Sequence, residues 1–172
     1  MFSAVGGAGL DAFHTHSGTT VYARPWLFEM AIWTPPLFGA AGLLVGLSYP
    51  VAERLTGTRP GRQLSWGEAL AGFAVFTGLY AMSGYLPVSH GARLVVLLAG
   101  AAGLFAWLAR TWLAVALAVI AAVVGPLVEA LLVHAGAFAY REPDMLGVAL
   151  WLPALYACGS LAFGAVGAKV ME

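Results

Sequence analysis

Few side chains in this sequence could carry out chemistry, and one of them lies in a long apolar run. That residue is Glu129, and His134 follows it five positions later. A carboxyl and an imidazole can exchange protons or share a metal, but five residues correspond to about 140° around a helix, so the two side chains do not share a face. We therefore expect Glu129 to be a hydrogen-bonding group at a cavity wall. A packing contact between helices and a catalytic or proton-carrying role are the alternatives.

Nucleophiles and metal ligands give no recognisable catalytic pattern. The candidate nucleophiles are Ser83, Cys158 and Ser160, and none has a His or Lys near it in the sequence. The densest group of possible ligands is Asp11, His14 and His16, in a polar stretch outside any predicted span. The single cysteine excludes an intramolecular disulfide. We expect no catalytic residue, no metal and no cofactor among these residues.

The composition is that of an integral membrane protein. Hydrophobic residues make up 61% of the 172 residues and charged residues only 9%, against roughly 25% charged residues in a soluble domain. Eight basic side chains balance eight acidic ones, so the chain lacks the positive charge that nucleic acid binding requires.

Runs of about 20 uncharged residues predict the helices that cross the bilayer. The chain is expected to be one all-α transmembrane domain over 1–172, with helices near 30–52, 69–88, 94–109, 112–138 and 145–168. A short first helix within 1–20 would bring the number to about six. The basic residues near one set of helix ends are Arg54, Arg59, Arg62, Arg110 and Lys169, and those near the other are Arg24, Arg93 and Arg141. This difference predicts a cytoplasmic C-terminus.

Prolines and glycines within these runs indicate how the helices pack. Pro35, Pro36, Pro126 and Pro153 are predicted to bend three helices and to open a gap between them. The closely spaced glycines are Gly39, Gly42 and Gly46, then Gly100 and Gly103, then Gly164 and Gly167. They would let helices approach within one protomer or between protomers. The helix over 94–109 offers a contact surface for a small homo-oligomer.

Several motifs, in order and at matching spacings, resemble the Insig (insulin-induced gene) family, whose animal members sense sterols in the endoplasmic reticulum. They are Trp33-Thr34-Pro35-Pro36, Gly46-Leu47-Ser48-Tyr49-Pro50, Ala74-Val75-Phe76-Thr77-Gly78, Gly136, Tyr140, Pro143-Asp144, Trp151-Leu152-Pro153, Gly159, Gly164 and Gly167. The resemblance implies six transmembrane helices and no catalysis. It also implies a lipid cavity among the helices that start near Met30, Ala69, Trp112 and Met145.

The resemblance has one further implication, and the sequence departs from the family pattern at two places. Asp144 matches a Pro-Asp motif that engages a partner membrane protein in animals, and the alternative is that it caps the last helix. Glu129-Ala130 stands where the family has Thr-Gln, and His134 where Tyr is usual, so the preferred ligand can differ. Abundant Arg, Ala and Gly indicate a bacterial, actinobacterial-type homologue in a plasma membrane.

The leading hypothesis is a sensor that holds a neutral lipid, such as a sterol or a diacylglycerol-like molecule. The four cavity helices contain no Arg or Lys within their spans to bind a phosphate. The predicted ligand-binding residues are Pro36, Phe76, Tyr80, Ser83, Glu129, His134, Trp151 and Tyr156. The alternatives are a membrane enzyme or proton-coupled carrier that uses Glu129 and His134, and a partner-binding scaffold that depends on Asp144 and the glycines.

Overall fold

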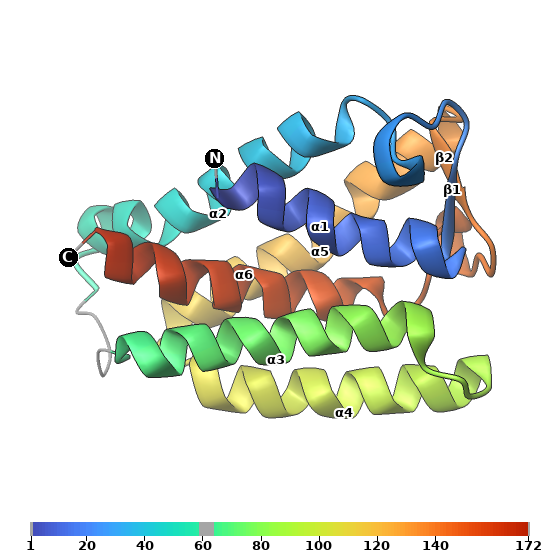
Figure 1. Cartoon of the computed structure of the whole chain (residues 1–172). Helices are drawn as coiled ribbons and strands as arrows, with labels where there is room; N and C mark the ends of the chain where they lie inside the picture. The colour runs from blue at the N-terminus through green and yellow to red at the C-terminus, as the bar shows by residue number, and fades with distance from the viewer. Residues whose placement is uncertain (1, 59–63, 172) are drawn as a thin grey trace.

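The described part of the chain forms six α-helices and one small sheet (Figure 1). This computed structural model describes residues 2–58 and 64–171, with backbone only for residues 2–5. The helices are α1 (Phe2–Ser17), α2 (Thr34–Thr56), α3 (Trp66–Tyr85), α4 (His90–Leu108), α5 (Trp112–His134) and α6 (Leu152–Val170). The strands are β1 (Thr20–Tyr22) and β2 (Phe138–Tyr140), and each is followed by a short 3-10 turn, η1 (Leu27–Glu29) or η2 (Met145–Gly147).

Polar side chains fix where three of the helices begin. Before α3, the Ser65 hydroxyl accepts a hydrogen bond from the backbone N–H of Glu68 at 3.2 Å, and the Glu68 carboxylate accepts one from the N–H of Ser65 at 2.8 Å. Ser89 caps α4, and Thr111 caps α5 by accepting from the N–H of Ala114 at 3.1 Å. These caps satisfy backbone donors that have no partner within the helix.

The prediction that Pro35, Pro36 and Pro153 bend their helices is wrong. These prolines lie in the first turns of α2 and α6, where a missing N–H costs no hydrogen bond. Both helices begin later than the apolar runs indicated, because residues 30–33 form an extended segment and a turn before α2, and η2 lies at the start of the run that leads into α6. Pro126 does lie inside α5, as expected.

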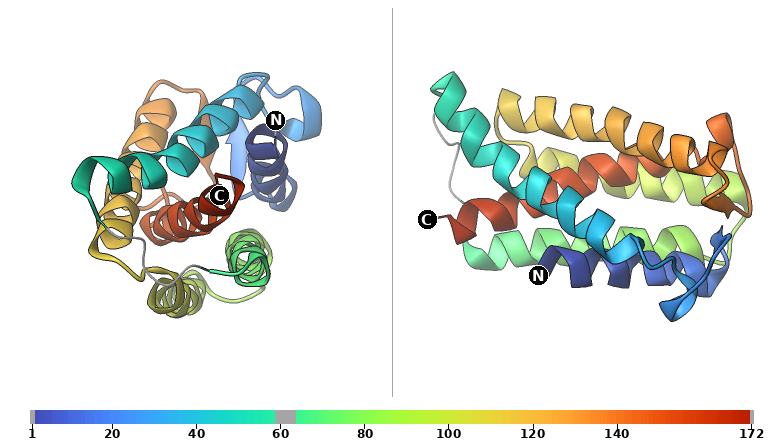
Figure 2. Two further views of the ribbon diagram at one scale, coloured as in Figure 1. Left: turned by 90° about the vertical axis from the view of Figure 1, so that its left-hand side faces the viewer. Right: turned by 90° about the horizontal axis from the view of Figure 1, so that it is seen from above.

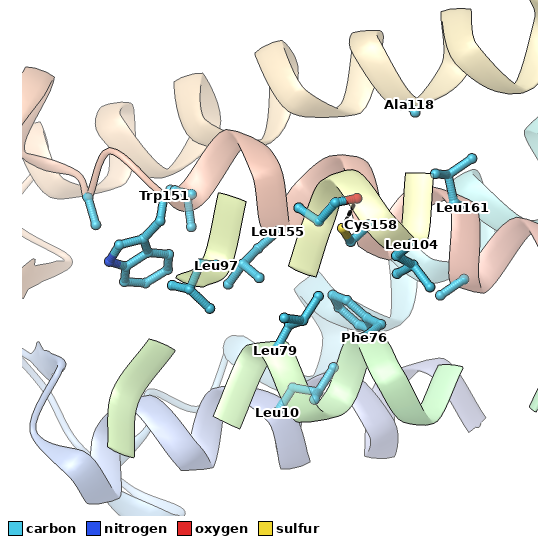
Figure 3. Packing of buried hydrophobic residues seen from close by; sticks show 14 of the residues in the cluster. Leu10, Phe76, Leu79, Leu97, Leu104, Ala118, Trp151, Leu155, Cys158 and Leu161 are labelled. Carbon is cyan, nitrogen blue, oxygen red and sulfur yellow. Dashed lines mark hydrogen bonds between the residues drawn. The ribbon is translucent and has the colours of Figure 1, made fainter. Parts of the chain in front are cut away.

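Helix α6 is the centre of the bundle and contacts α2, α3, α4 and α5 (Figure 2). Its buried face carries Trp151, Leu155 and Cys158, which gather with side chains of α3 and α4 in Figure 3. Gly100 of α4 allows close packing there, because a Cβ atom at that position would lie 2.4 Å from Leu79 Cδ2. The Leu79 side chain of α3 therefore packs directly on the backbone of α4 at Gly100.

The outer surface is apolar, as a lipid-facing surface must be. Large side chains such as Leu44, Leu55 and Leu131 are more than two-thirds exposed. Three of the described helices, α2, α4 and α5, are long and apolar enough to cross a membrane by length and composition. Helix α1 has 16 residues, which corresponds to about 24 Å and is shorter than the roughly 30 Å of hydrocarbon.

The two ends of the chain repeat one another with an offset of 118 positions. Gly18, Tyr22, Pro25, Ala31, Trp33 and Pro35 recur as Gly136, Tyr140, Pro143, Ala149, Trp151 and Pro153. The unit α1–β1–η1–α2 therefore corresponds to α5–β2–η2–α6, and α1 runs in the same direction as α5 in Figure 1. Helices α3 and α4 lie between the two units in the sequence.

Hydrogen bonds show that the two units are related by a pseudo-twofold rotation. The strands pair antiparallel with Val21 opposite Ala139 at the centre of the register. The N–H of Ala23 donates to the carbonyl of Ala137 at 3.1 Å. The 118-residue offset relates Ala23 to Arg141 and Ala137 to Thr19, and the N–H of Arg141 donates to the carbonyl of Thr19 at 2.9 Å. The sheet therefore joins the two units at one end of the bundle.

The two units also share their unusual backbone conformations. Gly18 and Gly136 have φ values of 70° and 72°, and Phe28 and Leu146 have values of 52° and 59°. Left-handed conformation at a large side chain is uncommon, and here it occurs at equivalent positions of η1 and η2. The two units therefore share strained backbone turns as well as identical residues.

Candidate functional site

A partly open cavity of about 90 Å³ lies among α1, α2, α3, α5 and α6. Its apolar wall includes Leu10, Phe38, Val45, Phe76, Leu155 and Phe163, and its polar lining includes Tyr80, Glu129, Tyr156 and Ser160. None of the described residues that line it is a Lys or an Arg. All four helices of the predicted lipid cavity contribute, together with α1.

Glu129 is held by two tyrosines at the wall of this cavity. Tyr140 Oη donates to Glu129 Oε2 at 2.5 Å, and Tyr156 Oη donates to Oε1 at 2.6 Å. Each carboxyl oxygen thus has a donor, which offsets part of the cost of placing an ionisable group in the membrane. Because burial raises the pKa of Tyr140 well above its usual value, this hydroxyl keeps its proton and remains a donor.

The two tyrosines reach Glu129 from different elements. Tyr140 lies in β2, where pairing with β1 fixes its position. Tyr156 lies one turn into α6 and packs on Gly125 of α5, where an added Cβ atom would lie 2.2 Å from Tyr156 Cδ1. Only glycine at position 125 leaves room for this ring.

The first unit contains a second carboxyl at the equivalent position. Asp11 precedes Glu129 by 118 positions and accepts a hydrogen bond from Tyr22 Oη at 2.8 Å, as Glu129 does from Tyr140. Burial raises the pKa of Tyr22, so this tyrosine also stays protonated. Phe38 occupies the place of Tyr156 and packs on Gly7, the counterpart of Gly125. Asp11 therefore has one tyrosine donor where Glu129 has two.

Beside the cavity, His14 and Ser83 support the Tyr80 ring. The Ser83 hydroxyl donates to the Tyr80 carbonyl at 2.6 Å, so it accepts the hydrogen bond that joins it to His14 Nε2 at 2.7 Å. The imidazole stacks on Tyr80 with ring centroids 4.2 Å apart. Asp11 and His14, which the sequence places in a polar stretch outside any predicted span, are both buried in α1.

The structure brings four of the eight predicted ligand-binding residues to the cavity. They are Phe76, Tyr80, Glu129 and Tyr156. Pro36, Ser83, His134 and Trp151 are not among its lining residues. Pro36 is exposed in the first turn of α2, and His134 is exposed at the end of α5. Trp151 is buried between His14 and Tyr140, at ring distances of 5.4 and 6.1 Å.

Asp144 closes the turn that leads into α6. Its Oδ2 atom accepts a hydrogen bond from the N–H of Leu150 at 2.9 Å and lies 3.2 Å from His90 Nε2. This is a local bond within the turn before α6 and not a cap of that helix, because the N-cap of α6 is Trp151, which makes no side-chain cap bond. In the described part of the chain, no three His, Cys, Asp or Glu side chains come together as a metal site would require.

Sequence reasoning missed Asp11, Tyr22 and Tyr140 as neighbours of the site. The signal that could have found them is the 118-residue repeat, which places Asp11 and Tyr22 in the positions of Glu129 and Tyr140. A comparison of the chain with itself would have paired both carboxyls with a tyrosine eleven residues later.

Comparison with known proteins identifies the family. No protein-family model matches the chain. The crystal structure of MvINS, an Insig homologue from Mycobacterium vanbaalenii, matches with a TM-score of 0.83 and 30% identity, over 96% of this chain and 88% of that one. This chain belongs to the Insig family. Its predicted resemblance is confirmed, and as an Insig-family protein it is an integral membrane protein.

Animal Insig proteins and an assembled form of MvINS also match. The chain is 31% identical to insulin-induced gene 2 protein of Gallus gallus and 30% identical to insulin-induced gene 1 protein of Bos taurus, each over 145 residues. It spans 64% and 52% of the lengths of these two Insig proteins. A cross-linked MvINS trimer matches with a TM-score of 0.84 and 28% identity, over 99% of this chain and 90% of that one.

Proposed function

We propose that this Insig-family protein is a non-catalytic sensor that holds a neutral lipid in its central cavity. The observation that supports this most directly is the carboxyl of Glu129, fixed by two tyrosine hydroxyls at the wall of an otherwise apolar cavity. A hydroxyl of a sterol or an acylglycerol needs one donor or acceptor and an apolar surround, and the cavity offers both. Without a lysine or arginine in its described lining, the cavity is poorly suited to a phosphate headgroup.

The size of the cavity indicates how the ligand is accommodated. A volume of about 90 Å³ is smaller than the roughly 300 Å³ at the lower end of small-molecule pockets. We infer that the lipid widens the cavity on entry, with the Phe38 ring between α1 and α2 as the group it displaces. Its hydroxyl then lies against Glu129 and Tyr80.

Identification of the retained lipid tests this proposal. The full chain is purified in a mild detergent, washed extensively and analysed by mass spectrometry, with Glu129→Leu purified in parallel. We expect near-stoichiometric neutral lipid in the unmodified protein and much less in the variant. A bulk-like mixture of membrane phospholipids in both would contradict the proposal.

We also propose that the protein forms a homo-oligomer, as MvINS does in its cross-linked trimer. Helix α4 supports this, because a Cβ atom at Gly103 would meet no atom within 4 Å and Val95 and Leu98 are exposed. Gly100, by contrast, is used within the protomer against Leu79. We expect Gly103→Leu to reduce the oligomer measured by light scattering in detergent, and an unchanged mass would place the interface elsewhere.

The orientation of the chain in the membrane and a partner-binding role of Asp144 are two further proposals. The distribution of basic residues near the helix ends supports a cytoplasmic C-terminus, although Arg59 and Arg62 among them lie outside the described residues. The abundance of Arg, Ala and Gly supports a bacterial plasma membrane. The resemblance to the family supports a partner-binding site at Asp144. If it exists, Asp144→Ala should break a complex with another membrane protein and leave lipid occupancy unchanged.

A further inference from the structure

A second and larger pocket of about 420 Å³ lies at the end of the bundle opposite the sheet. The end of α2, the α4–α5 connection and the end of α6 surround it, at the left-hand end of Figure 1. Its lining shares no residue with the central cavity. It is therefore a separate site, and its volume is in the range of small-molecule pockets.

The floor of this pocket is apolar and closed. Leu108, Leu161 and Tyr49 line it and are at most 9% exposed. The Tyr49 ring lies against Gly164, where an added Cβ atom would be 2.5 Å from Tyr49 Cε2, and its hydroxyl is 3.1 Å from Ser160 Oγ. The floor can therefore cover the apolar part of a ligand.

The rim of the pocket is basic. Arg54, Arg110 and Lys169 come from three different helix ends, and Glu53 is the acidic side chain among the lining residues. Arg110 Nε donates to the carbonyl of Trp107 at 2.5 Å, which orients the guanidinium and leaves its two Nη groups outside that bond. Arginine Nη groups are well suited to phosphate oxygens.

The backbone adds to the positive potential at one side of this rim. Thr111 lines the pocket and caps α5, so the N-terminal end of α5 points at it. The C-terminal ends of α2, α4 and α6 lie nearby and carry the opposite partial charge, which Arg54, Arg110 and Lys169 offset.

We propose that this basic-rimmed pocket binds the phosphate group of an anionic amphiphile. The phosphate would lie between Arg54 and Arg110, with the apolar part of the molecule over Tyr49 and Leu161. Basic pockets between membrane helices on the cytoplasmic side suit anionic lipid headgroups. The same chemistry fits a phospholipid of the surrounding leaflet and a soluble phosphate ester, and the experiment separates these two sources.

The test is a binding titration on the delipidated full chain in a non-ionic detergent, followed by native mass spectrometry. The probes are dioleoylphosphatidylglycerol, dioleoylphosphatidylcholine and glycerol phosphate. We expect phosphatidylglycerol to bind at least tenfold more tightly than phosphatidylcholine, and Arg54→Gln/Arg110→Gln to remove most of that preference. Competition by glycerol phosphate at comparable concentration would identify a soluble ester as the ligand, whereas no competition would identify the lipid.

Matched variants keep the test decisive. Arg24→Gln removes an exposed arginine at the opposite end of the bundle and should leave the preference intact. Arg54→Lys/Arg110→Lys keeps both charges and should retain most of it, and each single glutamine variant should lose part of it if the double variant does not fold. Neutral lipid in the central cavity should be unaffected throughout, so this proposal and the sensor proposal can fail independently. Equal affinity for the two phospholipids without binding of glycerol phosphate, or an equal loss in Arg24→Gln, would overturn it.

Discussion

Replacement of Glu129 separates a hydrogen-bonding role from a purely structural one. In Glu129→Gln the side chain keeps its shape and offers one acceptor and one donor, so both Tyr140 and Tyr156 can still bond to it. In Glu129→Leu both tyrosines lose their partner. We therefore expect the glutamine variant to retain the neutral lipid and the leucine variant to lose it.

The magnitudes show why binding, and not stability, is the quantity to measure. Two buried hydroxyls without a partner cost about 1 to 3 kcal/mol each. Removal of a carboxyl from a membrane helix returns at most roughly 2.5 to 3.5 kcal/mol, the value on insertion scales for the helix centre. These two effects largely cancel in the free energy of unfolding. Loss of one ligand hydrogen bond, about 1 to 3 kcal/mol, is not cancelled and corresponds to a rise in Kd of about 5- to 150-fold.

The assay is a titration of delipidated protein with dioleoylglycerol and with a sterol, using native mass spectrometry to count bound molecules. Asp11→Leu is the matched control, because Asp11 is the equivalent carboxyl of the other unit and is not among the lining residues of the cavity. We expect it to leave the Kd within a few-fold of the original value. Equal affinities in Glu129→Gln and Glu129→Leu would refute the assignment of Glu129 to the ligand.

Two other substitutions test the packing around the cavity. Gly125→Ala places a Cβ atom 2.2 Å from Tyr156 Cδ1, so it should displace that ring and lower both Tm and lipid retention, whereas Gly78→Ala on the exposed face of α3 meets no atom within 4 Å and should leave both unchanged. An unchanged Gly125→Ala protein would show that Tyr156 does not need its observed position. Ser83→Ala removes the partner of the fully buried His14 imidazole and should lower the free energy of unfolding by about 1 to 3 kcal/mol in a denaturant titration. A smaller loss would mean that the imidazole finds another partner.

Composition predicts that the chain is a membrane protein and roughly where most of its helices lie. It does not predict the residues at which the helices begin. In a soluble protein, a change from apolar to polar residues marks a helix terminus, whereas here the apolar run from Met145 continues through η2 into α6, and the run from Met30 includes four residues before α2 begins. A proline in such a run reads as a kink, although Pro35 and Pro153 occupy first turns, where their conformation favours the start of a helix.

The site was predicted only in part for a related reason. Glu129 stands out because an ionisable residue in a span is costly, and its position fixes the neighbourhood of the site. The inward face of a uniformly apolar helix cannot be read from its sequence, so Tyr80 and Tyr156 were found together with His134 and Trp151, which point elsewhere. Asp11 was missed because its burial depends on packing between α1 and distant helices.

The internal repeat also bears on the direction in which a bound molecule can lie. A cavity with true twofold symmetry would accept its ligand equally well in two orientations related by rotation. Here the backbone keeps the symmetry but the side chains break it, because Phe38 faces the cavity in one half and Tyr156 in the other. Glu129 lines the cavity, whereas its counterpart Asp11 is bonded to Tyr22 outside the lining. For the lipid that we propose, the two orientations would thus be unequal in energy, and its polar end would be directed to the α5–α6 half.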